Sequence, residues 1–117
     1  MKENVIKEKS FAFSLRIVKA YQFLVKQEKE FVLSKQMLRS GTAVGAMIRE
    51  AEQAESNADF IHKMAIALKE ANETEYWIDL LTAANYLEKT QSNSLKNDLT
   101  EILKLLTSII KTSKKKN

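Results

Sequence analysis

The side chains that could do chemistry are few, and their spacing restricts the kind of chemistry. Asp59 and His62 stand three positions apart, close to the Glu-x-x-His spacing that holds two metal ions in some four-helix carboxylate proteins. Such a site takes the motif from two helices, and this chain has one histidine and no cysteine. Nucleophilic catalysis also lacks a cysteine and a plausible Ser–His pair. We therefore expect no enzyme activity, no metal and no cofactor, and we interpret Asp59 as a carboxylate favoured by the dipole at a helix start.

A second group of side chains predicts a structural cluster. In the helix expected over residues 32–55, a small polar strip lies roughly 90° from the apolar stripe when residues are placed at about 100° intervals. This strip consists of Gln36, Arg39, Ser40, Ala43, Met47 and Glu50. Both glycines of the chain, Gly41 and Gly45, lie on the far flank of the apolar stripe. A glycine in a helix interior lowers stability by about 1 kcal/mol relative to alanine, so we expect close contact between helices to compensate.

The next expected helix, residues 58–87, carries a second strip of its own, formed by Glu70, Glu73, Trp77, Leu80 and Ala84. If the turn between the two helices is centred near residues 56–57, antiparallel register places Arg39 level with residue 74. We predict that Arg39 pairs with Glu73, with Glu70 or Glu75 as the substitute partner, because a planar guanidinium can bond a carboxylate at two points. A lone surface ion pair that adds little stability is the alternative.

Four helices must position these residues. Hydrophobic periodicity predicts them over residues 11–27, 32–55, 58–87 and 95–112. Ser10 is expected to cap the first helix, whose core stripe is predicted to be Phe11, Leu15, Val18, Tyr21, Leu24 and Val25. The last helix has the clearest period, with Leu95, Leu99, Ile102, Leu103, Leu106, Ile109 and Ile110 on one face. The polar patch 89–94 is expected to separate the last two helices. Because short connections join antiparallel neighbours, we predict an all-α single domain over residues 1–117, an antiparallel up-down-up-down four-helix bundle.

Composition agrees with a helical chain, since its 117 residues include no proline and two glycines. The net charge of +4 is unevenly distributed: residues 1–49 carry ten basic and four acidic groups, residues 50–79 two and eight, and residues 80–117 seven and three. Solvated faces of mixed sign are one explanation, and attraction between helices of opposite charge is the other. The candidates for contact with nucleic acid are Lys111, Lys114, Lys115 and Lys116 in a basic C-terminal tail at 111–117, with Arg16 and Lys19 in the first helix.

The first residues of the chain are charged, with lysines and glutamates among the first nine, and lack the apolar segment of a secretory signal. No apolar run approaches the roughly 20 residues that span a bilayer. The absence of cysteine excludes a disulfide framework. We therefore expect a cytoplasmic protein with no membrane partner.

Residues 36–51 and 67–77 together resemble two paired motifs of the bacterial 23S rRNA intervening-sequence protein family, often labelled "four helix bundle protein". The family motifs are similar to Gln-Leu-x-Arg-Ser-x-Thr-Ser-Ile-Gly-Ala-Asn-Ile-x-Glu-Ala and Ala-Leu-x-Glu-Ala-x-Glu-Thr-x-Tyr-Trp, and the likeness extends over about residues 10–112. Ala43 and Met47 depart from the pattern, because the family often has serine and asparagine there. Both departures lie on the small polar strip, which favours packing over polar binding at that strip.

The resemblance implies an antiparallel four-helix bundle that assembles as a homopentameric ring, with no established enzyme activity and an inferred association with RNA or another nucleic acid. The motif residues that it assigns to assembly are Gln36, Arg39, Ser40, Gly41, Gly45, Glu50, Glu70, Glu73 and Trp77. Two functions stay open. One is an oligomeric module that binds RNA, DNA or a nucleoprotein, and the other is a structural or protein-interaction scaffold that binds no nucleic acid.

Overall fold

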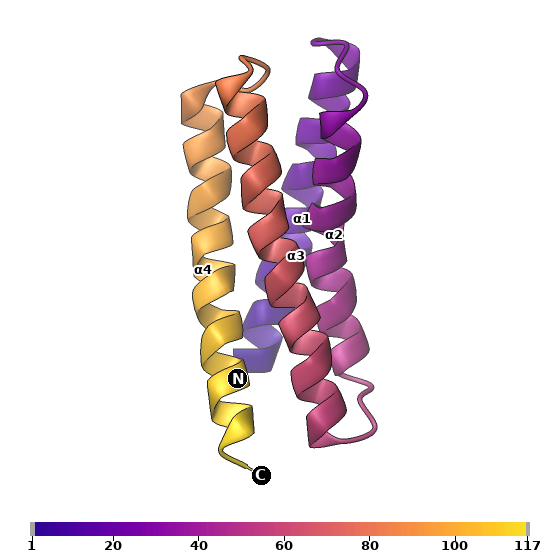
Figure 1. Ribbon diagram of the computed structural model, residues 1–117, viewed down its shortest axis with the longest axis vertical. Coiled ribbons are helices and arrows are strands. Elements are labelled where there is room, and N and C mark those ends of the chain that lie inside the picture. Colours follow the sequence, from indigo (N-terminus) through magenta and orange to yellow (C-terminus); the bar gives the residue numbers. More distant parts are fainter. Residues whose placement is uncertain (1, 117) are drawn as a thin grey trace.

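The structure is a computed structural model that describes residues 2–116, with side chains from Asn4 onwards. Within these residues the chain forms four α-helices and no strand: α1 (Lys2–Lys26), α2 (Leu33–Ala51), α3 (Asn57–Ala83) and α4 (Lys89–Lys114). Figure 1 shows the helices lying alongside one another, with the connecting loops at the two ends of the molecule. The molecule is elongated, measuring 48 × 21 × 19 Å.

Each helix packs against two others, since α1 and α3 both contact α2 and α4. The space between the four helices is filled by aliphatic side chains, one phenylalanine and two methionines. The largest fully buried side chains are Phe13, Ile6, Ile17, Leu24, Met37, Met64, Ile78, Leu81, Leu95, Leu99, Ile102 and Leu106. The stripe predicted for the last helix is confirmed, because its members are buried or packed against this core.

The first helix differs from its prediction in its start. α1 begins at Lys2 rather than at residue 11, so Ser10 lies inside the helix and is not a cap. The Ser10 hydroxyl donates to the Lys7 carbonyl oxygen at 3.1 Å. Serine can satisfy its hydroxyl on the backbone one turn earlier in a helix, so its presence alone does not mark a helix start.

The buried face of α1 was predicted only in part. Leu24 of the predicted stripe is buried and Tyr21 packs against the core, but Phe11 and Leu15 are 52% and 50% exposed. The rest of the core face is formed by Ile6, Phe13, Ile17 and Ala20. The helix carries two apolar stripes with the same helical period, and periodicity alone does not tell which of them faces the core. The close approach of Gly41 on α2 to Ile17 places the stripe that contains Ile17 against the core.

The other helix boundaries shift by a few residues. α2 ends at Ala51 rather than at residue 55, and α3 ends at Ala83, four residues before the predicted end. The chain then turns at Asn85, whose φ of 69° is the left-handed conformation that asparagine tolerates. The polar patch 89–94 is helical, because α4 begins at Lys89 and buries Ser92. α4 continues to Lys114, so Lys111 and Lys114 are helical rather than part of a loose tail, and Asn117 lies outside the described residues.

A buried carboxylate begins α2. Glu30 is 8% exposed, and its carboxylate accepts backbone N–H bonds from Val32 at 3.1 Å, Leu33 at 3.0 Å and Ser34 at 2.7 Å. These N–H groups have no partner within the helix, and a negative charge suits this end of the helix dipole. Burial alone would raise the pKa of Glu30, but the hydrogen bonds from Leu33, Ser34 and Val32 together outweigh it and lower the pKa below its ordinary value.

The close helix contact predicted at the glycines occurs inside the chain, between α2 and α1. A Cβ atom on Gly41 would lie 2.9 Å from Cγ2 and 3.0 Å from Cγ1 of Ile17. A Cβ atom on Gly45 would meet the Ser14 Oγ at 3.4 Å and the Ser10 carbonyl oxygen at 3.5 Å, which are ordinary contact distances. The close contact therefore requires a residue without a side chain at position 41 but not at position 45.

Gly41→Ala should destabilise the protein, whereas Gly45→Ala should not. Ile17 is fully buried and β-branched, so its side chain has little freedom to move aside. Overpacking a core typically costs about 1–3 kcal/mol, which at Gly41 exceeds the helix propensity of about 1 kcal/mol that alanine adds. At Gly45 that gain meets no clash, so this variant should be neutral or more stable. Urea denaturation of both variants measures the difference, and similar effects at the two positions would contradict this account.

Glu30→Gln should lower the free energy of unfolding at pH 7 by about 1–2 kcal/mol, the scale of a lost helix cap. Since the pKa of Glu30 is lower in the folded state, its ionised form contributes stability above the unfolded pKa, and this contribution is lost as the pH falls through the folded pKa. The gap between wild type and variant should thus close below about pH 4. Urea denaturation at several pH values measures the gap, and a gap that stays constant down to acid pH would rule out the charge as its cause.

Candidate functional site

Arg39 on α2 is held by two carboxylates of α3. Its Nη2 lies 2.6 Å from the Glu73 Oε2 and 3.1 Å from the Glu70 Oε1, and its Nη1 donates to the Glu70 Oε2 at 3.3 Å. The Arg39–Glu73 pair predicted from hairpin register is confirmed, and Glu70 joins it rather than replacing it. Hydrogen bonds to Glu70 and Glu73 raise the pKa of Arg39 above its ordinary value.

Trp77 completes this cluster from the same helix. Its indole Nε1 donates to the Glu73 Oε2 at 2.9 Å, and its ring meets Tyr76 edge to face with the centroids 5.1 Å apart. The hydrogen bonds from Trp77 and then from Arg39 lower the pKa of Glu73 below its ordinary value. Trp77 thus uses its apolar body against the core and its N–H against a carboxylate.

A buried pair of hydroxyls lies one residue further along each helix. The Thr74 Oγ1 is 2.9 Å from the Ser40 Oγ and 2.8 Å from the Glu70 carbonyl oxygen, and both Ser40 and Thr74 are fully buried. The sequence placed Ser40 at an assembly surface, and its burial between α2 and α3 removes it from any such surface. Thr74 was missed because a threonine within an apolar stripe gives no signal of its own, although the register that paired Arg39 with Glu73 also sets it level with Ser40.

The remaining motif residues do not join the cluster. Gln36 is exposed, and Glu50 pairs with Lys63 of α3 with 3.6 Å between Nζ and Oε1. Gly41 and Gly45 face α1, on the other side of α2. The structure therefore divides the motif into a polar contact between α2 and α3 and a small-residue contact between α2 and α1.

The cluster pairs one positive charge with two negative charges, so it keeps an excess of negative charge. The guanidinium of Arg39 is shared between two carboxylates, and the indole N–H of Trp77 is used by one of them. Ion pairs of this kind are weak evidence for stability and better evidence for a fixed register between two helices. The role that this arrangement supports is structural: it aligns α2 with α3.

The predicted nucleic-acid residues fall into two separate groups. Arg16 is held by α4, with 2.6 Å between its Nη1 and the Asp98 Oδ2 and a further hydrogen bond from Nη2 to the Ser94 Oγ at 2.8 Å. Lys111, thirteen residues beyond Asp98 on α4, lies about 20 Å further along the helix axis. Lys19 is exposed on α1. Arg16 is therefore tied to a carboxylate, away from the C-terminal lysines.

Asp59 and His62 lie in the first two turns of α3, where Ser56 is the helix cap and accepts the Asp59 N–H at 3.0 Å. The Asp59 carboxylate accepts the Glu55 N–H at 3.3 Å, and His62 is exposed. Among the side chains that the structure describes, no three His, Cys, Asp or Glu residues gather closely enough to hold a metal ion.

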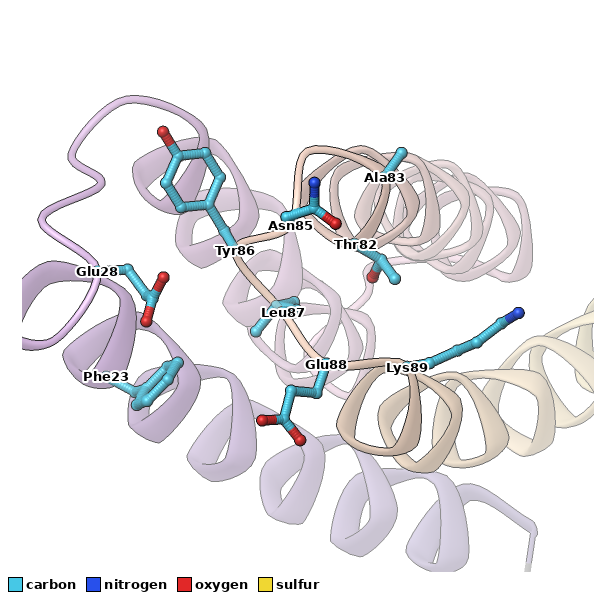
Figure 2. A pocket seen from close by; sticks show the side chains of 9 residues that line it. All are labelled: Phe23, Glu28, Thr82, Ala83, Asn85, Tyr86, Leu87, Glu88 and Lys89. Carbon is cyan, nitrogen blue, oxygen red and sulfur yellow. The ribbon is translucent and has the colours of Figure 1, made fainter.

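A hollow of about 660 Å³, open to solvent, lies where α1 ends and the α3–α4 loop passes. Figure 2 shows Glu28 and Glu88 on the side of Phe23, while Lys89 extends away from them. The lining residues are Phe23, Glu28, Thr82, Ala83, Asn85, Tyr86, Leu87, Glu88 and Lys89. No residue predicted for a site lines this hollow, and its charged groups do not converge on one point, so we assign it no role.

Comparison with known proteins identifies the family. The family model described as 23S rRNA-intervening sequence protein matches residues 2–108. The chain belongs to this family. A solved structure, described as a protein with unknown function from the S23 ribosomal protein family of Bacteroides thetaiotaomicron, is 64% identical, with 95% of this chain and 99% of that chain covered and a TM-score of 0.94. No curated protein is similar enough to give a match.

Membership in the 23S rRNA-intervening sequence protein family confirms the resemblance found in the two motifs. The matched region contains the Arg39 cluster and ends before Lys111. The C-terminal lysines therefore lie beyond the part of the chain that the family model describes. Within residues 2–116, no helix combines the length and the apolar character that crossing a membrane requires.

A double-mutant cycle between Arg39→Gln and Glu73→Gln should show that the two residues are coupled. We expect a coupling free energy of about 0.5–1 kcal/mol, at the upper end for exposed pairs, because Arg39 is held at several points. Lys9→Gln with Glu101→Gln is the matched control, since that pair joins two helices with a single exposed contact of 3.1 Å. Urea denaturation of each variant measures both couplings. A coupling at Lys9–Glu101 equal to that at Arg39–Glu73 would contradict a special role for the cluster.

Proposed function

We propose that this protein is a non-enzymatic, cytoplasmic protein that assembles with itself and associates with RNA through electrostatic contacts. The observation that carries the proposal is a group of exposed lysines at the C-terminal end of α4. They are Lys111, Lys114, Lys115 and Lys116, and none has a carboxylate within ion-pair distance among the described residues. The family description, 23S rRNA-intervening sequence protein, supports RNA as the polyanion.

Self-assembly would multiply this positive charge. A homopentamer, the state that the family resemblance implies, would bring five such lysine groups together and raise their effective concentration toward one RNA molecule. Exposed apolar side chains support contact between copies, because monomeric proteins seldom expose large contiguous apolar patches. Phe11 and Leu15, one turn apart on α1, are each at least half exposed.

A protein-interaction scaffold without nucleic-acid binding is the second candidate. The outward apolar stripe of α1 favours it, since Phe11 lies under the Arg49 guanidinium, with 5.2 Å from Cζ to the ring centroid, and Leu15 stands one turn further along. A partner that covered this stripe would bury more apolar surface than the lysine group offers. Under this hypothesis, changes to the C-terminal lysines would leave the partner's binding unaffected.

For the fold, we infer an antiparallel up-down-up-down order of the helices. The contacts between helices support it, because partners on α2 and α3 advance in opposite directions: Arg39 pairs with Glu73, and Glu50 pairs with Lys63. The same holds for α1 and α4, where Arg16 meets Asp98 and Lys9 meets Glu101. Short loops between consecutive helices favour the same order.

Size-exclusion chromatography with light scattering, run with and without RNA, tests the function. We expect a mass about five times the 13.4 kDa of one chain, and a larger mass with RNA at low salt that reverts as salt is raised, because phosphate contacts release counterions. A protein of the same mass that binds no RNA at low salt would favour the scaffold. A monomer mass would contradict self-assembly.

A further inference from the structure

We propose that the outward face of the second half of α4 binds the sugar–phosphate backbone of a double-stranded nucleic acid. The inference rests on the nucleic-acid association proposed above and names the surface and the form of the ligand. The surface, here called the α4 lysine face, consists of Lys104, Lys111, Lys114, Lys115 and Lys116. Lys104 was not among the residues singled out from the sequence, and Arg16 and Lys19 do not belong to this face.

The described part of the α4 lysine face contains no acidic side chain. All five lysines are exposed, and none lies within ion-pair distance of a carboxylate among the described residues. The last acidic residue of the chain is Glu101, which forms an ion pair with Lys9 of α1, with 3.1 Å between Oε2 and Nζ. Elsewhere on the molecule many basic side chains are paired, as Arg16 is with Asp98 and Lys96 is with Asp79. An anion would therefore find unpaired cations here and few competing carboxylates.

The helix holds three of these lysines, Lys104, Lys111 and Lys115, on one side. α4 continues to Lys114, and Lys115 keeps helical dihedral angles as its C-cap. Lys104, Lys111 and Lys115 are separated by seven and four residues, so they share one side of the helix. The rise per residue puts Lys104 and Lys111 about 10 Å apart along the axis. The positive charge is thus a ridge along the bundle rather than a frayed end.

The flank of the ridge on the α3 side is uncharged. The Asn57 Nδ2 donates to the Ser113 carbonyl oxygen at 2.9 Å, which ties the start of α3 to the end of α4. The residues that follow Asn57 on the same side of α3, at helical spacing, are Ile61, Ala65 and Leu68. The Asp59 side chain is directed to the α2–α3 loop, because its Oδ2 accepts from the Glu55 N–H, and its Oδ1 lies 3.9 Å from the Lys63 Nζ on the same helix. Alongside Ile61, Ala65 and Leu68, a phosphate backbone can approach α4 without meeting a carboxylate of α3.

The form of the nucleic acid follows from what the ridge lacks. Single strands are bound largely by stacking their bases on aromatic side chains, and α4 contains no aromatic residue. The most exposed aromatic side chains lie elsewhere, with Phe11 on α1, Phe31 in the α1–α2 loop and Tyr76 on α3. Lysines without stacking partners fit the regularly spaced phosphates of a duplex, which positions a protein without reading its sequence.

The test compares the binding of a duplex RNA of about 20 base pairs with that of one of its strands, across a range of salt concentrations. Wild-type protein should bind the duplex more tightly than the single strand. Lys104→Gln with Lys111→Gln should lower the slope of log K against log salt by about 2 for each subunit in contact, and weaken binding about 10–100-fold at 0.1 M salt. Both residues are exposed, so folding should be unaffected, and circular dichroism checks this.

Lys26→Gln with Lys35→Gln is the matched control, because it removes the same charge from exposed lysines on α1 and α2 that have no ion pair among the described residues. It should leave the slope within about 0.5 of the wild-type value. Equal losses in the two double variants would overturn the α4 lysine face while leaving RNA association intact. Single-strand binding as tight as duplex binding would overturn the choice of ligand. A wild-type protein that binds neither RNA at low salt would overturn the nucleic-acid function itself, and this inference with it.

Discussion

The contact between Gly41 and Ile17 determines how α1 lies on α2. Without a side chain at Gly41, the two helices approach until a β-carbon there would stand 2.9 Å from the isoleucine. Closeness of this kind fixes the rotation of α1 about its own axis, since only the stripe that contains Ile17 and Phe13 can then face the core. The stripe with Phe11 and Leu15 is left outside. The rotation also brings Arg16 to Asp98 and Lys9 to Glu101, so these two acidic groups of α4 form ion pairs with α1.

Hydrogen bonds and ion pairs, rather than close apolar packing, set the register between α2 and α3. Arg39, Glu70, Glu73 and Trp77 form one network near the surface, and Ser40 and Thr74 form a second contact that is fully buried. A leucine stripe tolerates a shift of one turn, because each side chain finds a similar neighbour after the shift. A hydroxyl pair and a shared guanidinium distinguish the native register, since a shift would break the Thr74–Ser40 hydrogen bond and separate Arg39 from its two carboxylates. Specific register is thus concentrated in six residues of two helices.

Much of the architecture could be predicted from the sequence, because it follows from periodicity and from the rarity of helix breakers. The stripe of α4 and the Arg39–Glu73 pair were found this way, the second from nothing more than the position of a turn. The failures have definite physical causes. The face of α1 was wrong in part because two stripes share one period, and the α4 start was wrong because a polar first turn of a helix looks like a loop. Lys104 was overlooked because its significance depends on which acidic residues of α4 form ion pairs with α1. These pairs can be known only from the three-dimensional arrangement.

The long separation between the partners that join α1 to α4 has a consequence for how the bundle opens. Arg16 and Asp98 are 82 residues apart in the chain, whereas Arg39 and Glu73 are 34 apart. Closing the longer loop loses more chain entropy, and the exposed ion pairs found along this seam return little of it. The contacts between α2 and α3 are more local in the chain, so the opening of the native protein that needs the least free energy should separate α1 from α4. The bundle would then behave as a cylinder with one weak seam, and hydrogen exchange would enter the core from that side.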